Sequence, residues 1–194
     1  MEAARQMMIA LYLVRHAHAD WAADEERPLS ERGHHDSRRV ADVLQAYPIG
    51  AIYSSPFRRA RETVAPLAAR LALAIRMEPA LRERRLGQSS AGFRQAVEAT
   101  WRDPSFSHPG GESNAVAQRR GLAFIRRLQE GQAAEHVVLS THGNLLALIL
   151  QGFVPEIDYA FWTSLTMPDI HRLSMEPGGK STVERLWKED RACQ

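Results

Sequence analysis

The chain of 194 residues is long enough for one domain with a sizeable core, and its 44% hydrophobic and 25% charged residues are ordinary for a globular protein. The formal net charge of +2 is too small to indicate a nucleic-acid partner, even though the pI is near 9.0. No stretch is long enough to span a membrane, and the lone cysteine, Cys193, excludes an intrachain disulfide framework. We therefore expect a single domain over residues 1–194, a cytoplasmic location, and no membrane or nucleic-acid partner.

The chain opens with an apolar, β-prone run from Met7 to Val14, which predicts a short buried strand. Arg15 and His16 follow where this strand should end. In open α/β sheets ligands bind beyond the carboxyl ends of the strands, and a guanidinium beside an imidazole suits an anion held against a nucleophile or a base. Taken alone, the pair is equally compatible with two solvated side chains at an ordinary strand end.

A polar loop over residues 18–28 then leads to Ser30, which predicts the N-cap of a helix with apolar residues at helical spacing as far as Tyr47. His34 and His35 stand near the start of this helix. Neighbouring residues in a helix point in different directions, so we expect a solvated helix end here and not a pair of metal ligands.

Residues 51–54 predict a second short strand. Ser55 can cap the next helix and Pro56 can take its first position, after which apolar residues recur at helical spacing as far as Leu71. A further strand is expected over residues 73–77.

Three arginines, Arg58, Arg59 and Arg61, lie in the first turn of this helix. A helix N-terminus carries a partial positive charge, so each solvated cation there costs a few tenths of a kcal/mol. An anion bound at the same helix start would turn this cost into a gain. The placement therefore favours an anion site.

The segment 81–87 contains one carboxylate, Glu83, among three arginines. On charge alone, this pattern is typical of a surface ion-pair cluster that contributes little. The following region, about 88–109, is less regular, with a predicted helix over 93–101 and a loop that contains proline and serine. We expect this region to form a cap over the site.

The second half of the chain repeats the arrangement seen at His16. A break at 110–113 starts another helix, and residues 136–140 form a continuous apolar run of the kind found in parallel strands. His142 follows this strand directly, and residues 145–150 are apolar nearly all round, as in a buried helix. His142, like His16, therefore stands between the end of a strand and the start of a helix.

Near the C-terminus, residues 169–175 and 182–187 predict two strands joined by a turn at 177–179. The alternation of strands and helices along the chain indicates an α/β fold, a three-layer α/β/α sandwich with a largely parallel central sheet. The right-handed crossovers of such a sheet bring the carboxyl ends of the strands to one edge. Arg15, His16, Arg59 and His142 should converge there.

At this point the sequence resembles the histidine phosphatase superfamily, which contains cofactor-dependent phosphoglycerate mutases and histidine acid phosphatases. The resemblance runs from Leu11 to about Leu173. The run Leu-Val-Arg-His at 13–16 is similar to the Arg-His signature of the family, and residues 54–63 are similar to the segment with the second phosphate-binding arginine. That arginine stands immediately before an alanine, which selects Arg59.

Two further motifs complete the resemblance. The segment 81–84, followed by Gly87, is similar to the segment that carries the family's acid, which makes Glu83 the candidate proton donor. Residues 140–144 are similar to the motif of the second catalytic histidine, here His142. Four motifs in this order and spacing are far more specific than the Arg-His pair alone.

Three departures from the family pattern favour a phosphatase over a mutase. Ala17 follows the first histidine where many members have glycine. Residues 88–92 lack the acidic, tryptophan-containing run that is common at this point, and the segment between Glu83 and His142 is shorter than in the glycolytic mutases.

The resemblance implies a phosphomonoesterase that acts on a small phosphorylated substrate, and the residue chemistry fits it. A neutral imidazole is a competent nucleophile, so His16 is expected to form a phosphohistidine. Arg15, Arg59 and His142 are expected to hold the phosphoryl oxygens, and Glu83 to protonate the leaving oxygen and then activate water. No metal and no cofactor are expected, because the arginines and one histidine stabilise the charge, and the resemblance implies the same.

Two other classes of protein fit parts of the pattern. His16 and His18 have the His-x-His spacing of the metal pair in barrel metallohydrolases, but a full barrel needs about 250 residues and this chain lacks further strand-end ligands. A binding module for phosphorylated ligands without catalysis is the other alternative. The presence of His16, Glu83 and His142 together argues against it.

Within the family, the alternatives are a cofactor-dependent phosphoglycerate mutase and a phosphatase that acts on phosphohistidine in proteins. The loop around Asp20 and Trp21 and the cap at 88–109 are expected to select the substrate. The sequence predicts no particular oligomeric state.

Overall fold

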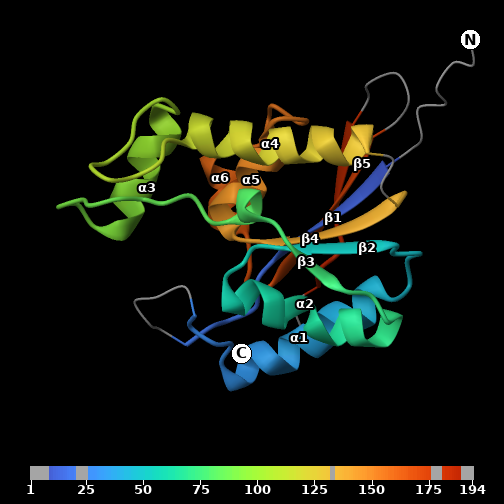
Figure 1. Cartoon of the computed structure of the whole chain (residues 1–194). Coiled ribbons are helices and arrows are strands. Elements are labelled where there is room, and N and C mark those ends of the chain that lie inside the picture. The colour runs from blue at the N-terminus through green and yellow to red at the C-terminus, as the bar shows by residue number, and fades with distance from the viewer. Residues whose placement is uncertain (1–8, 21–25, 132–133, 176–180, 189–194) are drawn as a thin grey trace, which may run out of the picture.

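The computed structural model describes residues 9–20, 26–131, 134–175 and 181–188. In chain order its elements are β1 (Ile9–Arg15), α1 (Glu31–Leu44), β2 (Ala51–Ser54), α2 (Arg58–Leu71), β3 (Ile75–Met77), the 3-10 helix η1 (Pro79–Leu81), α3 (Phe93–Arg102), α4 (Asn114–Glu130), β4 (His136–Thr141), α5 (Gly143–Gln151), α6 (Tyr159–Ser164), β5 (Asp169–Met175) and β6 (Ser181–Arg185). Figure 1 shows a central sheet with α1 and α2 on one face and α4, α5 and α6 on the other. This arrangement confirms the predicted three-layer α/β/α sandwich.

The described strands form one six-stranded sheet in the order β3-β2-β4-β1-β5-β6. The first four are mutually parallel, whereas β5 is antiparallel to β1 and β6 is antiparallel to β5. The sheet is therefore largely parallel, as predicted. In the pairing register Arg15 lies opposite Thr141 and Ser54 lies opposite Ser140, so β1, β4 and β2 end together at one edge.

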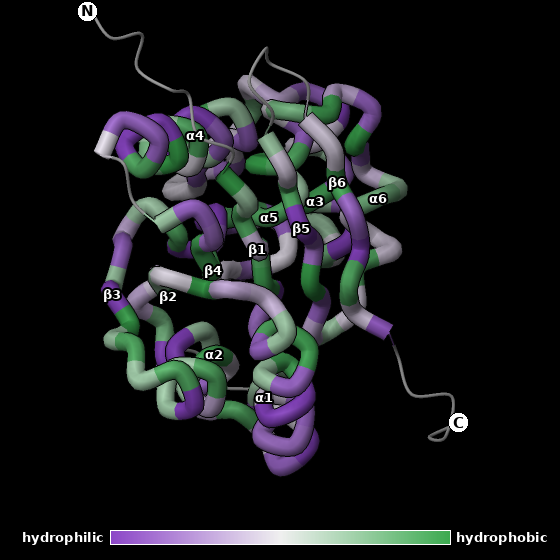
Figure 2. The backbone as a smooth tube through the Cα atoms, turned by 90° about the vertical axis from the view of Figure 1, so that its right-hand side faces the viewer, coloured by the Kyte–Doolittle hydropathy of each residue, from purple (hydrophilic) through white to green (hydrophobic). Residues whose placement is uncertain are grey.

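Alternate residues of the central strands fill two separate cores. Leu11 and Leu13 of β1 belong to the core that includes residues of α4 and α5, whereas Tyr12 and Val14 belong to the core against α1 and α2. This division follows from the two-residue period of a strand, which sends successive side chains to opposite faces. A strand buried on both faces must be apolar throughout, and Figure 2 shows the hydrophobic residues of β1 and β4 between the two helix layers.

The predicted start of the helix after Ser55 is wrong. That helix, α2, begins at Arg58 with Phe57 as its N-cap, and Pro56 lies before it. Ser55 directly follows β2, and its backbone N–H still donates to the carbonyl oxygen of Ser140 at 2.8 Å. Its Oγ accepts from the backbone N–H of Phe57 at 3.3 Å, in a turn that precedes the helix and delays its start to Arg58.

Other elements lie within a few residues of the predicted bounds, and Ser30 caps α1 by accepting from the Gly33 N–H at 3.1 Å. The helices η1 and α6 were not predicted, because a single turn of helix has too few residues for its period to be recognised. Residues 7 and 8 of the first predicted strand, Trp21 and the turn at 177–179 lie outside the described residues. Among the described helices, none has the length and apolar character needed to cross a membrane.

Candidate active site

The polar residues at the ends of β1 and β4 and at the start of α2 lie together. Nε of Arg59 donates to Nε2 of His16 at 3.2 Å, and the ring centroids of His16 and His142 are 5.1 Å apart. All three side chains, together with Arg15, line a cavity of about 320 Å³. The predicted convergence at one edge of the sheet is therefore observed, and its cause is the common register of the parallel strands.

His16 is a buried, neutral imidazole. Only 4% of the residue is exposed, and its Nδ1 lies 2.8 Å from the carbonyl oxygen of Ala17. A carbonyl can only accept, so Nδ1 carries the proton and Nε2 keeps its lone pair. Burial lowers the pKa of His16 to about 3, and the charges of Arg59, Arg15 and Arg27 act in the same direction.

His142 is also buried and uncharged. One nitrogen, Nε2, lies 2.9 Å from Oγ of Ser55, while the buried Nδ1 has no hydrogen-bond partner among the described residues. Burial holds the pKa of His142 well below its ordinary value, with His16 and the neighbouring arginines adding to the effect. A buried nitrogen without a partner, on a residue that lines the cavity, is suited to a ligand atom.

Four arginines line this cavity, namely Arg15, Arg27, Arg59 and Arg84. Nη1 of Arg15 donates to the carbonyl oxygen of Leu165 at 2.8 Å, but its buried Nε has no hydrogen-bond partner in the described part of the chain. Arg84 is 4% exposed, and its Nε and Nη1 likewise have no partner among the residues described. Burial lowers the pKa of Arg15 and Arg84, yet an arginine stays protonated in proteins. Buried N–H donors without hydrogen-bond partners are costly, and a bound anion that accepts from them would offset that cost.

Gly143, the first residue of α5, lets Arg15 approach the helix closely. A Cβ atom at this position would lie 3.0 Å from Nε and 3.1 Å from Cζ of Arg15. Any larger residue would therefore push the guanidinium away from the N-terminus of the helix. The glycine directly after His142 thus leaves room for the guanidinium of Arg15, the last residue of β1.

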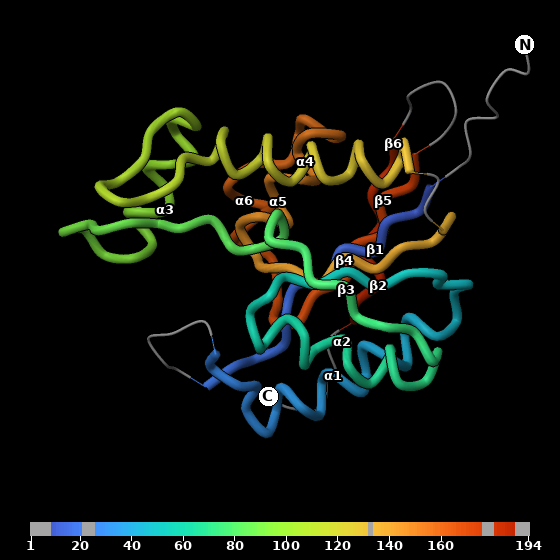
Figure 3. Tube along the Cα trace, in the orientation of Figure 1, coloured from blue at the N-terminus to red at the C-terminus, as the bar shows by residue number. Residues whose placement is uncertain are grey.

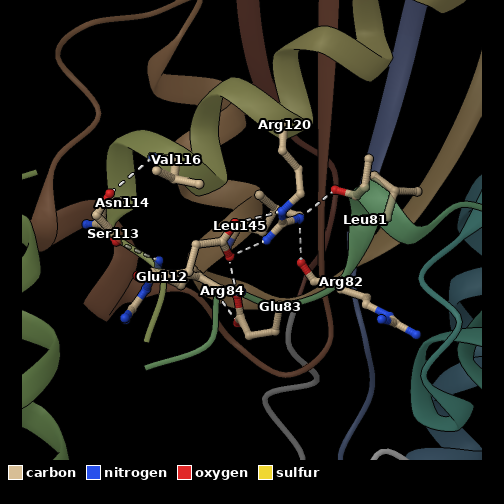
Figure 4. Close-up of polar contacts among 12 residues, drawn as sticks. Leu81, Arg82, Glu83, Arg84, Glu112, Ser113, Asn114, Val116, Arg120 and Leu145 are labelled. Carbon is tan, nitrogen blue, oxygen red and sulfur yellow. Dashed lines mark hydrogen bonds and ion pairs between the residues drawn. The ribbon is translucent and has the colours of Figure 1, made fainter. Parts of the chain in front are cut away.

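The Glu83 carboxylate lies at the N-terminus of α5. Oε1 accepts from the backbone N–H groups of Leu145 at 3.0 Å and Arg84 at 2.8 Å, and Oε2 accepts from that of Asn144 at 3.1 Å. Figure 4 shows the carboxylate directed towards Leu145 while the Arg82 side chain points away. Glu83 is half-buried and lines the cavity, so the interpretation of a surface ion-pair cluster does not describe it.

A larger cleft of about 930 Å³ adjoins the cavity and shares Arg59, Glu83 and Arg84 with it. The segment expected as a cap, 88–109, contributes to both spaces, and Figure 3 shows that it projects beyond the sheet. Its described side chains divide between the spaces, with Phe93 and Val97 at the cavity and Ser105 and Ser107 at the cleft.

Arg27, Arg84 and Ser55 belong to the site although the sequence did not indicate this role for them. Arg27 lies in a polar loop without a motif, and Ser55 had been assigned to a helix cap. Arg84 directly follows Glu83, and that adjacency is the one signal from which its place could have been found.

His18 does not join His16. It is exposed, and its Nδ1 lies 2.8 Å from Oγ of Ser30 at the N-terminus of α1. Asp20 is exposed as well. Across residues 9–20, 26–131, 134–175 and 181–188, no three or more His, Cys, Asp and Glu side chains are grouped so that they could hold a metal ion.

The family model of the histidine phosphatase superfamily (branch 1) matches residues 11–190, so the chain belongs to this family. A protein of Photorhabdus laumondii named as a probable phosphoglycerate mutase is 30% identical over 161 residues, which cover 74% of each chain. The glucosyl-3-phosphoglycerate phosphatase of Mycobacterium tuberculosis is 28% identical over 177 residues, 80% of this chain and 79% of that one.

The fold agrees with this assignment. The structure of a mycobacterial glucosyl-3-phosphoglycerate phosphatase in complex with inorganic phosphate is similar, with a TM-score of 0.71 and 26% identity. The match covers 91% of this chain and 95% of that one.

The depressed pKa of His16 predicts how stability depends on pH. Between pH 6.5 and about 3 the unfolded chain binds a proton at this residue and the folded protein does not. The free energy of unfolding should therefore fall as the pH falls through this window, by up to about 1.4 kcal/mol per pH unit. His16→Asn keeps a donor for the Ala17 carbonyl and should remove about this much of the slope.

The measurement is chemical denaturation of both proteins at several pH values within that window. His34→Gln is the matched control, because His34 is exposed on α1 and its substitution should leave the slope unchanged. An equal slope in the wild type and in His16→Asn would contradict the assignment of His16 as a buried, neutral group.

Proposed function

We propose that this chain is a phosphomonoesterase that hydrolyses small phosphorylated metabolites through a phosphohistidine on His16. The observation that carries the proposal is a neutral imidazole at a cavity lined by four arginines, with Nδ1 protonated and Nε2 accepting from Nε of Arg59. Such a site combines a nucleophile that needs no deprotonation with positive charge for a phosphoryl dianion.

In the first step the phosphoryl group displaces His16 as the acceptor of the Arg59 hydrogen bond, which frees the Nε2 lone pair. Nε2 attacks phosphorus, and the bond between phosphorus and the leaving oxygen breaks. Arg15, Arg59 and Nδ1 of His142 hold the phosphoryl oxygens and stabilise the charge that develops on them. Glu83, in its protonated form, gives its proton to the leaving oxygen, so the alcohol departs neutral.

In the second step water attacks the phosphohistidine and gives a proton to the Glu83 carboxylate. The bond from phosphorus to Nε2 breaks, inorganic phosphate leaves, and His16 returns to its neutral form. The three backbone N–H groups on Glu83 hold the carboxylate between the two steps. The arginines supply the positive charge and the neutral His142 a hydrogen bond, so the scheme needs neither a metal nor a cofactor.

We also propose that residues 1–194 form a single domain, that 88–109 cap the site, and that the protein is cytoplasmic. The side chains that the cap segment contributes to the cavity and to the cleft support its part in substrate selection. Glucosyl-3-phosphoglycerate and 3-phosphoglycerate are the first substrates to test, because the relatives are named for activity on such molecules.

A phosphoglycerate mutase is the second candidate, and the name of the Photorhabdus relative favours it. A mutase would pass the phosphoryl group from the histidine to a second hydroxyl of the substrate and not to water. Incubation with 3-phosphoglycerate separates the two activities, since hydrolysis releases inorganic phosphate and a mutase forms the isomer.

The covalent step predicts a labelled enzyme. Brief exposure to a phosphomonoester labelled in its phosphoryl group should leave acid-labile, base-stable label on His16, detectable by quenching and peptide mapping. His16→Ala should lose about a thousandfold or more in turnover, as deletions of nucleophiles commonly do. Label that survives this substitution would remove His16 from the role.

The proposed scheme uses no metal, and this predicts how the enzyme responds to orthovanadate and to EDTA. Orthovanadate resembles the transferring phosphoryl group and should inhibit competitively, whereas EDTA should leave turnover unchanged. Steady-state rates on p-nitrophenyl phosphate provide the measurement. Activity that is lost on chelation and restored by a divalent ion would support a metallohydrolase instead.

The role of Glu83 predicts a dependence on the leaving group. Glu83→Gln should slow phosphorylation by glycerol phosphate about a hundred- to ten-thousandfold, because a basic alkoxide needs the proton. It should retain far more of its rate on p-nitrophenyl phosphate, whose leaving group barely needs one. Single-turnover experiments with enzyme in excess isolate this step, and equal losses on both substrates would mean that Glu83 is not the acid.

A further inference from the structure

The backbone just before Glu83 is held by one side chain of α4, that of Arg120. Nη1 of Arg120 donates to the carbonyl oxygen of Ala80 at 2.7 Å and to that of Arg82 at 3.0 Å. Figure 4 shows Arg120 reaching down from α4 to the segment that carries Glu83. These contacts lie just before Glu83, one on η1 at Ala80 and one at Arg82 in the irregular segment that follows η1.

Arg120 is itself fixed by Glu112, which lies just before α4. Oε1 of Glu112 accepts from Nε of Arg120 at 2.9 Å, and Oε2 accepts from Nη2 at 2.7 Å. Their side chains are only 24% exposed for Arg120 and 19% for Glu112. Four of the five N–H donors of the guanidinium are thereby used, and its planar geometry sets the distance between carboxylate and backbone.

Glu112 also holds the other side of the acid. Its backbone N–H donates to the carbonyl oxygen of Arg85 at 2.7 Å. The pair therefore binds the main chain before Glu83, through Arg120, and after it, through Glu112. The carboxylate of Glu83 is held separately, by backbone N–H groups of α5.

We propose that Glu112 and Arg120 are positioning residues that keep Glu83 where it can protonate the leaving oxygen. This inference rests on the proposed function, in which Glu83 is the acid. Proton transfer requires an approach to within hydrogen-bond distance, and a displacement of about 1 Å can cost a hundredfold in rate. Without the Arg120 side chain, the carbonyl oxygens of Ala80 and Arg82 lose these donors, and the backbone just before Glu83 is held less firmly.

The test compares two substrates in single-turnover experiments with enzyme in excess. Arg120→Met should slow alcohol release from glycerol phosphate about ten- to a hundredfold, but change the rate on p-nitrophenyl phosphate by less than about threefold. Arg120→Lys keeps the charge but lacks the planar fork, so it should give the same contrast. Equal losses on the two substrates, in variants that chemical denaturation finds folded, would overturn the proposal.

The double variant separates positioning from contact with the substrate, because Arg120 also lines the larger cleft. If Arg120 acts only through Glu83, then Glu83→Gln with Arg120→Met should be no slower on glycerol phosphate than Glu83→Gln alone. Losses that multiply, or a raised KM in place of a lowered rate, would mean that Arg120 contacts the substrate, and would overturn the positioning role.

Arg127→Met is the matched control. Arg127 lies on the same helix and pairs with Glu78 at 3.2 Å, next to the same segment, but the contacts around Glu83 do not involve it. The Arg127→Met variant should leave the rates on glycerol phosphate and on p-nitrophenyl phosphate unchanged. If Glu83→Gln gives the leaving-group contrast and the Arg120 variants do not, the positioning role fails and the proposed function stands. If none of them gives the contrast, the assignment of Glu83 as the acid fails and the positioning role fails with it.

Discussion

The site depends on unbalanced positive charge around two neutral histidines. Four arginines line a cavity into which His16 and His142 bring no charge of their own, because burial keeps both imidazoles deprotonated. The only carboxylate at the cavity, among the residues described, is Glu83, and backbone N–H groups occupy its oxygens. An anion from outside would accept from the N–H groups of Arg15 and Arg84 that have no partner among the described residues, so the groups proposed to bind it lie beside those proposed for the chemistry.

The groups of the site come from several segments of the chain, and the sheet brings these segments together. β1, β2 and β4 end in register, and each is followed by a polar residue that reaches the cavity or touches one that does. Because α5 starts directly after His142, its first N–H groups are free to hold the Glu83 carboxylate. Histidine, helix N-terminus and acid are therefore parts of one local arrangement. The helix α4 adds a second point of attachment through Arg120.

The sequence was sufficient to predict the layers, the parallel strands and the meeting of His16, Arg59 and His142, because the period of apolar residues fixes which face each element buries. It was not sufficient for contacts that depend on the exact path of a loop. Arg84 resembles a member of a surface ion-pair cluster until the backbone around it is known, and Ser55 has the composition of a helix cap although it lies in a turn before the helix. Charge patterns do not distinguish a solvated arginine from one buried without a partner.

The pairing of β1 with β4 also has a consequence for how the protein folds. The hydrogen bond between the Tyr12 hydroxyl and Nδ1 of His136 joins residues 124 positions apart in the chain. Contacts between such distant residues form slowly, because a long loop must close before they contribute to stability. His16 and His142 meet only when this central pair has formed. The return of catalytic activity during refolding therefore reports the closure of the loop between β1 and β4, and a fragment that ends before β4 lacks His142.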